Sequence, residues 1–88
     1  MQVLENKNNL LIMQNNVGNY EFFSYNSKIA VIDNKNNKLY LTDLWDYSQT
    51  TLKQLKYFIN KYSKKIIYTT KKEFEKELET NKNIHFMD

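Results

Sequence analysis

Short apolar segments alternate with polar turns in the first half of the chain, and this pattern predicts a β-meander. Leu10–Gln14, Tyr20–Tyr25 and Ser27–Asp33 are apolar or aromatic and are separated by asparagine-rich stretches. Lys38–Thr42 alternates apolar and polar residues, as a strand with one buried face does. The consecutive apolar residues inside Ser27–Asp33 predict a central strand covered on both faces. We therefore expect an antiparallel meander of three or four strands in this half of the chain.

The turns between these strands contain residues that tolerate a left-handed backbone. Gly18 is the only glycine of the chain, and its place in a polar turn predicts a positive φ. The loop Asn34–Lys38 has no glycine, so we expect an asparagine to supply the left-handed residue of that hairpin. Residues 1–9 are polar apart from Val3 and Leu4 and predict no element.

The apolar period then changes to that of an amphipathic helix. We expect this helix to run from about Gln49 to Tyr62, with Ser48 or Thr50 as its N-cap. Its apolar stripe should pack on one face of the sheet. The stripe consists of Leu52, Leu55, Phe58, Ile59 and Tyr62.

A second helix is expected over Lys71–Thr80, because Thr70 and Glu73 have the spacing of a capping box. Before it, Ile66–Tyr68 is a β-prone run that predicts an additional edge strand. The tail that follows the helix is expected either to add a strand or to dock Phe86. The predicted fold class is α+β: a single domain over residues 1–88, with an antiparallel sheet of three to five strands and two helices.

The composition excludes several classes of protein. A chain of 88 residues is long enough for one domain only. Because it contains no cysteine, it can form neither a disulfide nor a thiolate metal site. The N-terminus lacks the basic and apolar regions of a signal peptide, and the longest apolar runs are too short to cross a bilayer. We expect a cytoplasmic protein with no membrane contact.

The segment Asp43–Ser48, which joins the predicted sheet to the first helix, is one candidate site. It carries the only tryptophan, Trp45, together with Asp46 and Tyr47. One interpretation is a recognition patch, because tryptophan and tyrosine are common anchors of protein interfaces. The alternative is structural: Trp45 fills the corner between sheet and helix, and Asp46 accepts backbone amides at the helix start, where its charge suits the helix dipole.

A basic face on the first predicted helix is the second candidate site. All 13 basic residues of the chain are lysines, the net charge is +3, and the region Lys53–Lys72 contains no acid. The helix residues opposite the apolar stripe could follow a phosphate backbone, meet an acidic protein or form an ordinary solvated face. They include Lys53, Lys56, Tyr57 and Lys61. The absence of arginine disfavours sequence-specific reading of DNA, and lysine beside abundant asparagine indicates an AT-rich genome.

Catalytic chemistry is not expected from these residues. The only histidine, His85, lies close to the C-terminus, where a general base would be poorly held. Asp43 and Asp46 alone are too few ligands for a metal ion, and the serines have no histidine partner at an identifiable spacing. We therefore expect no enzyme, no cofactor and no bound metal.

Two segments in the middle of the chain carry distinctive motifs, Phe22–Ala30 (FFSYNSKIA) and Trp45–Ile59 (WDYSQTTLKQLKYFI). They resemble a Ser-Tyr-x-(Ser/Thr)-x-Ile-Ala strand and a Trp-Asp-Tyr-Ser-x-Thr-Thr helix start in small uncharacterised proteins of phages and mobile elements of AT-rich bacteria. Gln54 stands where that group often has a histidine, so a function requiring it is not expected here. The resemblance implies that the motif residues act together. These are Ser24, Tyr25, Ile29, Ala30, Trp45, Asp46, Tyr47, Ser48, Thr50 and Thr51.

A small phage-borne domain without catalytic groups is expected to act by covering a surface of a larger host machine. We therefore expect a non-enzymatic inhibitor that binds a host protein or nucleoprotein complex in the bacterial host cell. By analogy of size and implied origin, CRISPR-type defence nucleases are the expected class of target. The alternative is a nucleic-acid-binding accessory protein that uses the region Lys53–Lys72. Either protein could be a monomer or a homodimer, since an N-terminal edge strand could pair with its copy.

Overall fold

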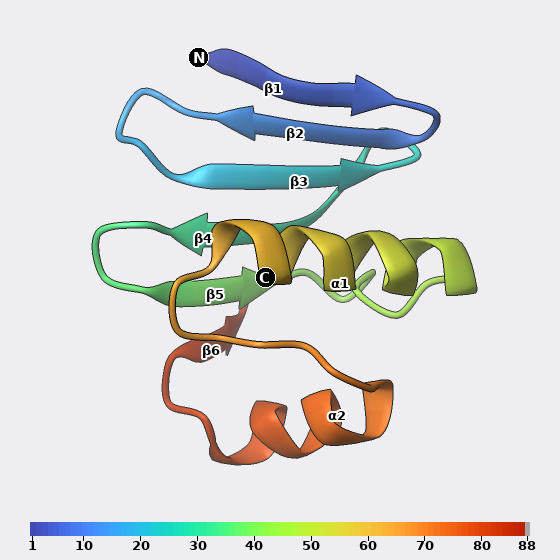
Figure 1. Cartoon of the computed structure of the whole chain (residues 1–88), viewed down its shortest axis with the longest axis vertical. Coiled ribbons are helices and arrows are strands. Elements are labelled where there is room, and N and C mark those ends of the chain that lie inside the picture. The colour runs from blue at the N-terminus through green and yellow to red at the C-terminus, as the bar shows by residue number, and fades with distance from the viewer. Residues whose placement is uncertain (88) are drawn as a thin grey trace.

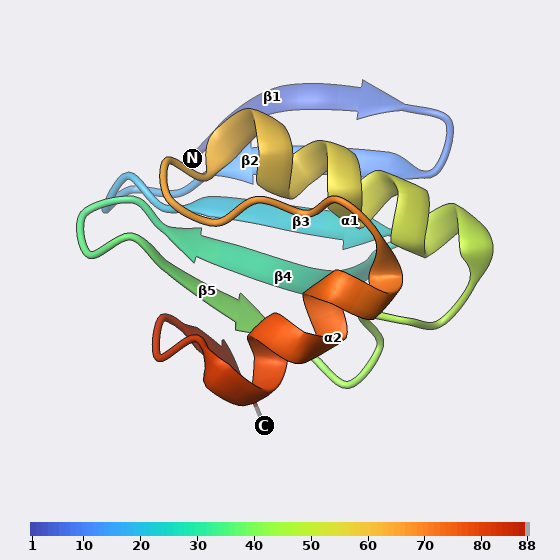
Figure 2. The same cartoon turned by 60° about the horizontal axis from the view of Figure 1, so that its bottom comes forward.

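A six-stranded mixed sheet carries two helices on one of its faces (Figure 1, Figure 2). The computed structural model describes residues 1–87, so Asp88, the last residue of the expected domain, lies outside the described residues. The sheet order follows the chain, β1-β2-β3-β4-β5-β6. The strands are β1 (Gln2–Lys7), β2 (Leu10–Gln14), β3 (Tyr20–Ser24), β4 (Ser27–Asp33), β5 (Lys38–Leu41) and β6 (Ile84–Phe86), and the helices are α1 (Gln49–Tyr62) and α2 (Lys71–Thr80).

The α+β class and the packing of α1 on the sheet are confirmed, but the expected antiparallel sheet of three to five strands is wrong in two respects. β1 escapes prediction because it is an edge strand whose side chains mostly face water, with only Leu4 and Glu5 half-buried. β6 pairs with β5 in parallel, because the two helices return the chain to the end where β5 starts. The tail thus adds a strand, and Phe86 stays 55% exposed.

Local backbone signals place the turns and helix starts as the sequence predicts. Gly18 has a φ of 89°, and Asn37 supplies the left-handed residue of the β4–β5 hairpin with a φ of 55°. Ser48, one of the two residues expected to cap α1, accepts a hydrogen bond from the Thr51 amide at 3.1 Å. Thr70 caps α2 in the same way. Each cap satisfies an amide that the first helical turn leaves without a partner.

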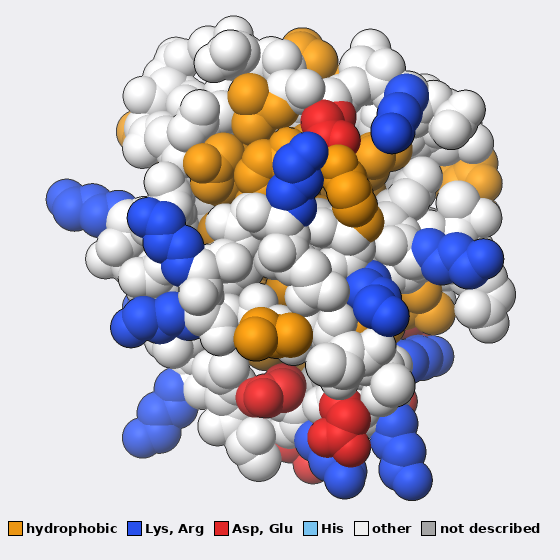
Figure 3. Space-filling model, in the orientation of Figure 1, with side chains coloured by type: hydrophobic (Ala, Val, Ile, Leu, Met, Phe, Trp, Pro, Cys, Tyr) orange, Lys and Arg blue, Asp and Glu red, His pale blue; other side chains and the backbone are white. Residues whose placement is uncertain are grey.

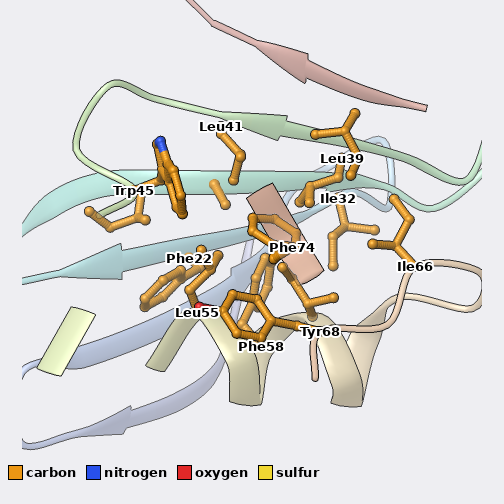
Figure 4. Packing of buried hydrophobic residues seen from close by; sticks show 14 of the residues in the cluster. Phe22, Ile32, Leu39, Leu41, Trp45, Leu55, Phe58, Ile66, Tyr68 and Phe74 are labelled. Atoms are coloured by element: carbon orange, nitrogen blue, oxygen red, sulfur yellow. The ribbon is translucent and has the colours of Figure 1, made fainter. Parts of the chain in front are cut away.

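The core is one apolar layer between the sheet and the helices (Figure 4). Phe58 anchors α1 and is fully buried, with its ring centroid 5.3 Å from that of Phe22 on β3. Phe74 anchors α2 between two other rings. Its ring centroid lies 4.6 Å from that of Tyr68 and 5.7 Å from that of Trp45. Aromatic rings bury large areas and attract one another at these separations. A few rings therefore hold both helices on a sheet of short strands.

The predicted edge strand at Ile66–Tyr68 is wrong, and the side chain of Asn60 on α1 explains why. Its amide donates to the Tyr68 carbonyl and accepts from the Tyr68 N–H, both at 2.8 Å. These are the two backbone bonds that a neighbouring strand would make. Ile66 and Tyr68 are buried while Ile67 is exposed, so the segment has the alternation of a strand without belonging to the sheet.

The prediction that β4 is covered on both faces is also wrong for the single chain. α1 and α2 lie on the same side of the sheet (Figure 2), where their apolar residues join a single core. The opposite side of β4 carries Val31, which is only half-buried. No described element of the chain covers this second face.

Replacement of Phe58 by alanine should lower the free energy of unfolding by about 3–5 kcal/mol, because it removes a fully buried ring and leaves a cavity between α1 and β3. Phe86→Ala is the matched control. As this ring is largely exposed, its loss should cost no more than about 1 kcal/mol. Urea unfolding of both variants measures the difference, and equal losses would contradict the assignment of the core.

Candidate functional site

One end of the sheet brings both sequence motifs together. The β1–β2 turn, the β3–β4 turn and the start of α1 all lie at this end, on the right of Figure 1. Ser24, from the end of β3, is the first residue of one motif quoted above and is buried. Thr51, from the first turn of α1, belongs to the other and is fully buried beside it. Two segments separated by more than twenty residues thus meet through their polar side chains.

These side chains form a hydroxyl chain that runs in one direction. Ser48 Oγ donates to Thr51 Oγ1 at 3.1 Å, and Ser24 Oγ donates to Gln54 Oε1 at 2.6 Å. The oxygens of Thr51 and Ser24 are 3.2 Å apart. Each hydroxyl has a single proton, and that of Ser24 is used on Gln54, so Thr51 must donate to Ser24. The hydroxyl chain therefore runs Ser48 to Thr51 to Ser24 to Gln54.

The hydroxyl chain ends on an amide and so contains no general base. An amide oxygen accepts a hydrogen bond but does not take up a proton near neutral pH, so Ser24 is not activated as a nucleophile. The only histidine, His85, is on β6 and stacks on Tyr40. Among residues 1–87, no group of three or more histidine, cysteine or acidic side chains could hold a metal ion. The contacts within the hydroxyl chain are thus hydrogen bonds between neutral groups.

A hollow of about 240 Å³ opens over the hydroxyl chain. Ser24 and Thr51 contribute to its lining, and Ser27 and Ile29 lie beside them. Three large exposed side chains complete it. These are Tyr25, Leu44 and Tyr47, and Tyr47 is 71% exposed. We call this feature the tyrosine hollow.

Tyr25 has a backbone conformation that is unfavourable for tyrosine. It forms the two-residue β3–β4 turn with Asn26, and both have positive φ, 51° and 67°. Such turns favour asparagine and glycine, whereas a left-handed backbone costs other L-residues about 1–2 kcal/mol. Tyr25 is 48% exposed, so core packing does not account for the choice. Strain of this kind is a signal of function.

A second hollow of about 230 Å³ is lined in part by Gln54, the last residue of the hydroxyl chain. Lys7 and Lys53 give it a positive charge, and the side chain of Gln54 separates it from Ser24. The other residues that line it are Asn8, Leu10 and Tyr57. We call it the lysine hollow, and the two hollows together are the end surface.

The junction Asp43–Ser48 divides between core and surface. Trp45 is only 8% exposed and packs edge-on against Phe74. It is part of the core, as the structural alternative for this junction expects. Asp46 is exposed, and Ser48 rather than Asp46 caps α1. Tyr47 remains on the surface. The end surface thus keeps one of the three junction residues proposed as a recognition patch.

Part of the basic face of α1 is engaged within the protein. Glu5 on β1 accepts hydrogen bonds from the hydroxyls of Tyr57 and Tyr62, both at 2.5 Å, and from Lys61 at 3.1 Å. These contacts join the edge strand to α1, so Tyr57 and Lys61 are not free in the way that the sequence pattern indicates. Glu5 escapes sequence reasoning because it lies in a segment that predicts no element.

The Glu5 cluster also shifts the acidity of its members. Burial opposes ionisation of Glu5, but hydrogen bonds from Tyr57, Tyr62 and Lys61 outweigh it and lower its pKa to about 2. Burial and the hydrogen bond to Glu5 raise the pKa of Tyr62 to about 12. Hydrogen bonds with Tyr57 and Glu5 raise the pKa of Lys61. The cluster is an ion pair of Glu5 and Lys61 to which two tyrosine hydroxyls are hydrogen-bonded.

The remaining lysines are distributed rather than concentrated. Lys53, Lys56 and Lys71 surround a third hollow of about 320 Å³ between α1 and the start of α2. Elsewhere on this side, Figure 3 shows the basic side chains spread over the outline of the molecule, with acidic ones near α2 at the bottom. A backbone-binding groove needs a continuous basic track, which this face does not show.

Comparison with known proteins gives one match. The model of a protein family described as a family of unknown function (DUF8033) matches residues 1–76, a span that includes the whole end surface. Searches of curated proteins and of solved structures give no match. In the described part of the chain, neither helix has the length and apolar character needed to cross a membrane.

Glu5→Gln should destabilise the protein in a pH-dependent way. The carboxyl titrates near its ordinary value of 4.5 when unfolded and at about 2 when folded. Its ionised form therefore stabilises the fold fully above pH 4.5, and this contribution is lost as the pH falls toward 2. Urea unfolding should show a loss of about 1–2 kcal/mol at neutral pH that shrinks across this window.

Glu79→Gln, on the exposed side of α2, is the control for loss of one negative charge. Its stability should follow that of the wild type across the same pH series. A Glu5→Gln deficit that stays constant down to the lowest pH would contradict the role given to the carboxylate.

Proposed function

This chain belongs to the family of unknown function DUF8033, and we propose from its surface that it is a non-enzymatic domain that binds a partner protein through the end surface. The observation that carries the proposal is the tyrosine hollow, with Tyr25, Leu44 and Tyr47 exposed around buried hydroxyls. Exposed aromatic side chains beside a pocket are the usual anchors of protein interfaces. The strained backbone of Tyr25 supports the same site.

The size of the hollow favours a protein side chain over a free small molecule. At about 240 Å³ it lies below the usual range of small-molecule pockets, roughly 300–1,000 Å³. The hydroxyls beneath it bond to one another, so an apolar group can enter without leaving them unpaired. We infer that the partner inserts an apolar side chain here.

The lysine hollow adds a charge preference to this interface. Lys7 and Lys53 lie beside Gln54 with no acidic residue among the residues that line the hollow. Opposite charge on the partner would steer its approach and fix its register. The partner segment is therefore acidic next to its apolar anchor.

The proposed class of partner comes from the resemblance to phage and mobile-element proteins. Within that group, we propose that this chain inhibits a bacterial host defence complex of the CRISPR nuclease type, in the host cytoplasm. The absence of a general base from the hydroxyl chain supports inhibition by occupancy rather than by chemistry. This finer proposal is an analogy, and an assay against such nucleases tests it together with protein binding.

A nucleic-acid-binding accessory function is the second candidate. The third hollow favours it, because Lys53, Lys56 and Lys71 could contact phosphates there. The ion pair of Lys61 with Glu5 weighs against it, because it removes a lysine from the basic face. A mobility-shift assay should then show binding that falls steeply between about 50 and 200 mM salt.

The protein-binding proposal is tested by incubating the purified chain with a panel of purified CRISPR-type nucleases. We expect a stoichiometric complex with at least one of them and loss of its guided DNA cleavage. Tyr47→Ala should weaken that complex by roughly tenfold or more, as truncation of an interface anchor does. Ile67→Ala, which removes another exposed apolar side chain, should leave the affinity unchanged.

Tyr25→Asn separates the effect of the strained turn on stability from its effect on partner binding. Asparagine tolerates the left-handed backbone, so the free energy of unfolding should rise by up to about 1 kcal/mol, whereas partner binding should weaken. Urea unfolding and the same binding assay measure the two effects. If no nuclease binds, the inhibitor proposal fails. If a complex forms but is indifferent to both tyrosine variants, the end surface is not the interface.

A further inference from the structure

The side of the sheet opposite the helices carries a row of side chains that crosses all six strands. Successive cross-strand partners define the row. Its members are Val3, Met13, Glu21, Val31, Tyr40 and His85. Their neighbours along each strand, such as Ile12 and Phe22, lie in the core, so the row faces away from it. A second row on this side contains Leu11, Phe23 and Lys28. We call these two rows the open face.

The open face is too apolar for a surface that only meets water. Antiparallel sheets with one solvated face normally place polar residues on that side. Here Glu21 and Lys28 are the only aspartate, glutamate, lysine or arginine side chains in the two rows, and they pair with each other at 3.2 Å. Lys28 Nζ also lies 5.7 Å from the centre of the Phe23 ring. The face is therefore mostly apolar and close to neutral, although the whole chain carries +3.

His85 ends the first row at β6. Its ring stacks on Tyr40 with centroids 5.3 Å apart. The Nε2 atom is buried and has no hydrogen-bond partner among the described residues. Such atoms are rare in folded proteins.

We propose that a second copy of this chain covers the open face, so that two sheets pack against each other with the helices outside. The molecule extends 32 × 29 Å across its broad side, enough for the roughly 800 Å² per partner of a stable interface. A two-fold axis would place identical faces together. Because each face carries an internal ion pair, two copies meet without net repulsion.

This arrangement follows the known geometry of sheet packing. Sheets stack about 10 Å apart with strands within about 30° of one another. The second copy supplies the missing cover of β4, whose sequence predicts burial on both faces. The end surface lies at the ends of the strands and on α1, so it stays free in both copies. The inference is thus independent of the proposed function.

Sedimentation equilibrium tests the dimer, with Val31→Lys as the main variant. The wild type should sediment as a dimer at micromolar concentration. A lysine at this central position would bury an unpaired charge between the two sheets, and dissociation should become at least about 100-fold easier. The matched control is Val17→Lys, the same change at a residue 78% exposed in the β2–β3 turn, which should remain a dimer.

Circular dichroism establishes that each variant is folded, and Tyr40→Glu repeats the test if Val31→Lys is not. A wild type that is monomeric at concentrations well above micromolar overturns the proposal. A dimer that survives both open-face substitutions overturns it as well, since another surface, such as the β1 edge, would then hold the copies together. Dissociation by Val31→Lys and not by Val17→Lys supports it.

Discussion

The contact between Phe58 and Phe22 sets the position of nearly every other feature. It seats α1 on β3 with both rings fully buried. One helical face then fixes the rest, since residues three, four and seven positions apart share a side. Thr51 is placed against Ser24 at one end of the helix, and Tyr62 against Glu5 at the other. A single hydrophobic contact thus registers two polar clusters at opposite ends of α1.

The two polar clusters differ in what they leave available. At the Glu5 cluster, the carboxylate accepts hydrogen bonds from the lysine and from both tyrosine hydroxyls. These bonds attach β1 to α1. At the hydroxyl chain the hydrogen bonds are equally internal, yet they hold an open hollow between strained and exposed tyrosines. The first cluster therefore stabilises the position of β1 against α1. The second supports the surface on which the proposed function rests.

The sequence predicts elements whose signals are local and misses those that depend on distant partners. The α1 stripe and the Ser48 cap are short-range patterns, and both are confirmed. Ile66–Tyr68 is misread because Asn60, a side chain on a neighbouring helix, takes the bonds of a strand. The lysines of α1 are read as one face because sequence alone cannot place Glu5 beside Lys61. The site motifs are visible in the sequence, but their convergence needs the fold.

The parallel attachment of β6 has a consequence for the order in which the chain folds. Each pairing from β1 to β5 joins segments adjacent in sequence, so hairpins can close within microseconds once their turns form. The pairing of β5 with β6, by contrast, joins Leu39 to Ile84. It closes a long loop that contains both helices, so it forms later. During synthesis on a ribosome the β5 edge stays unpaired until β6 emerges. The nascent chain therefore carries an exposed strand edge, a template for mispairing, until β6 is in place.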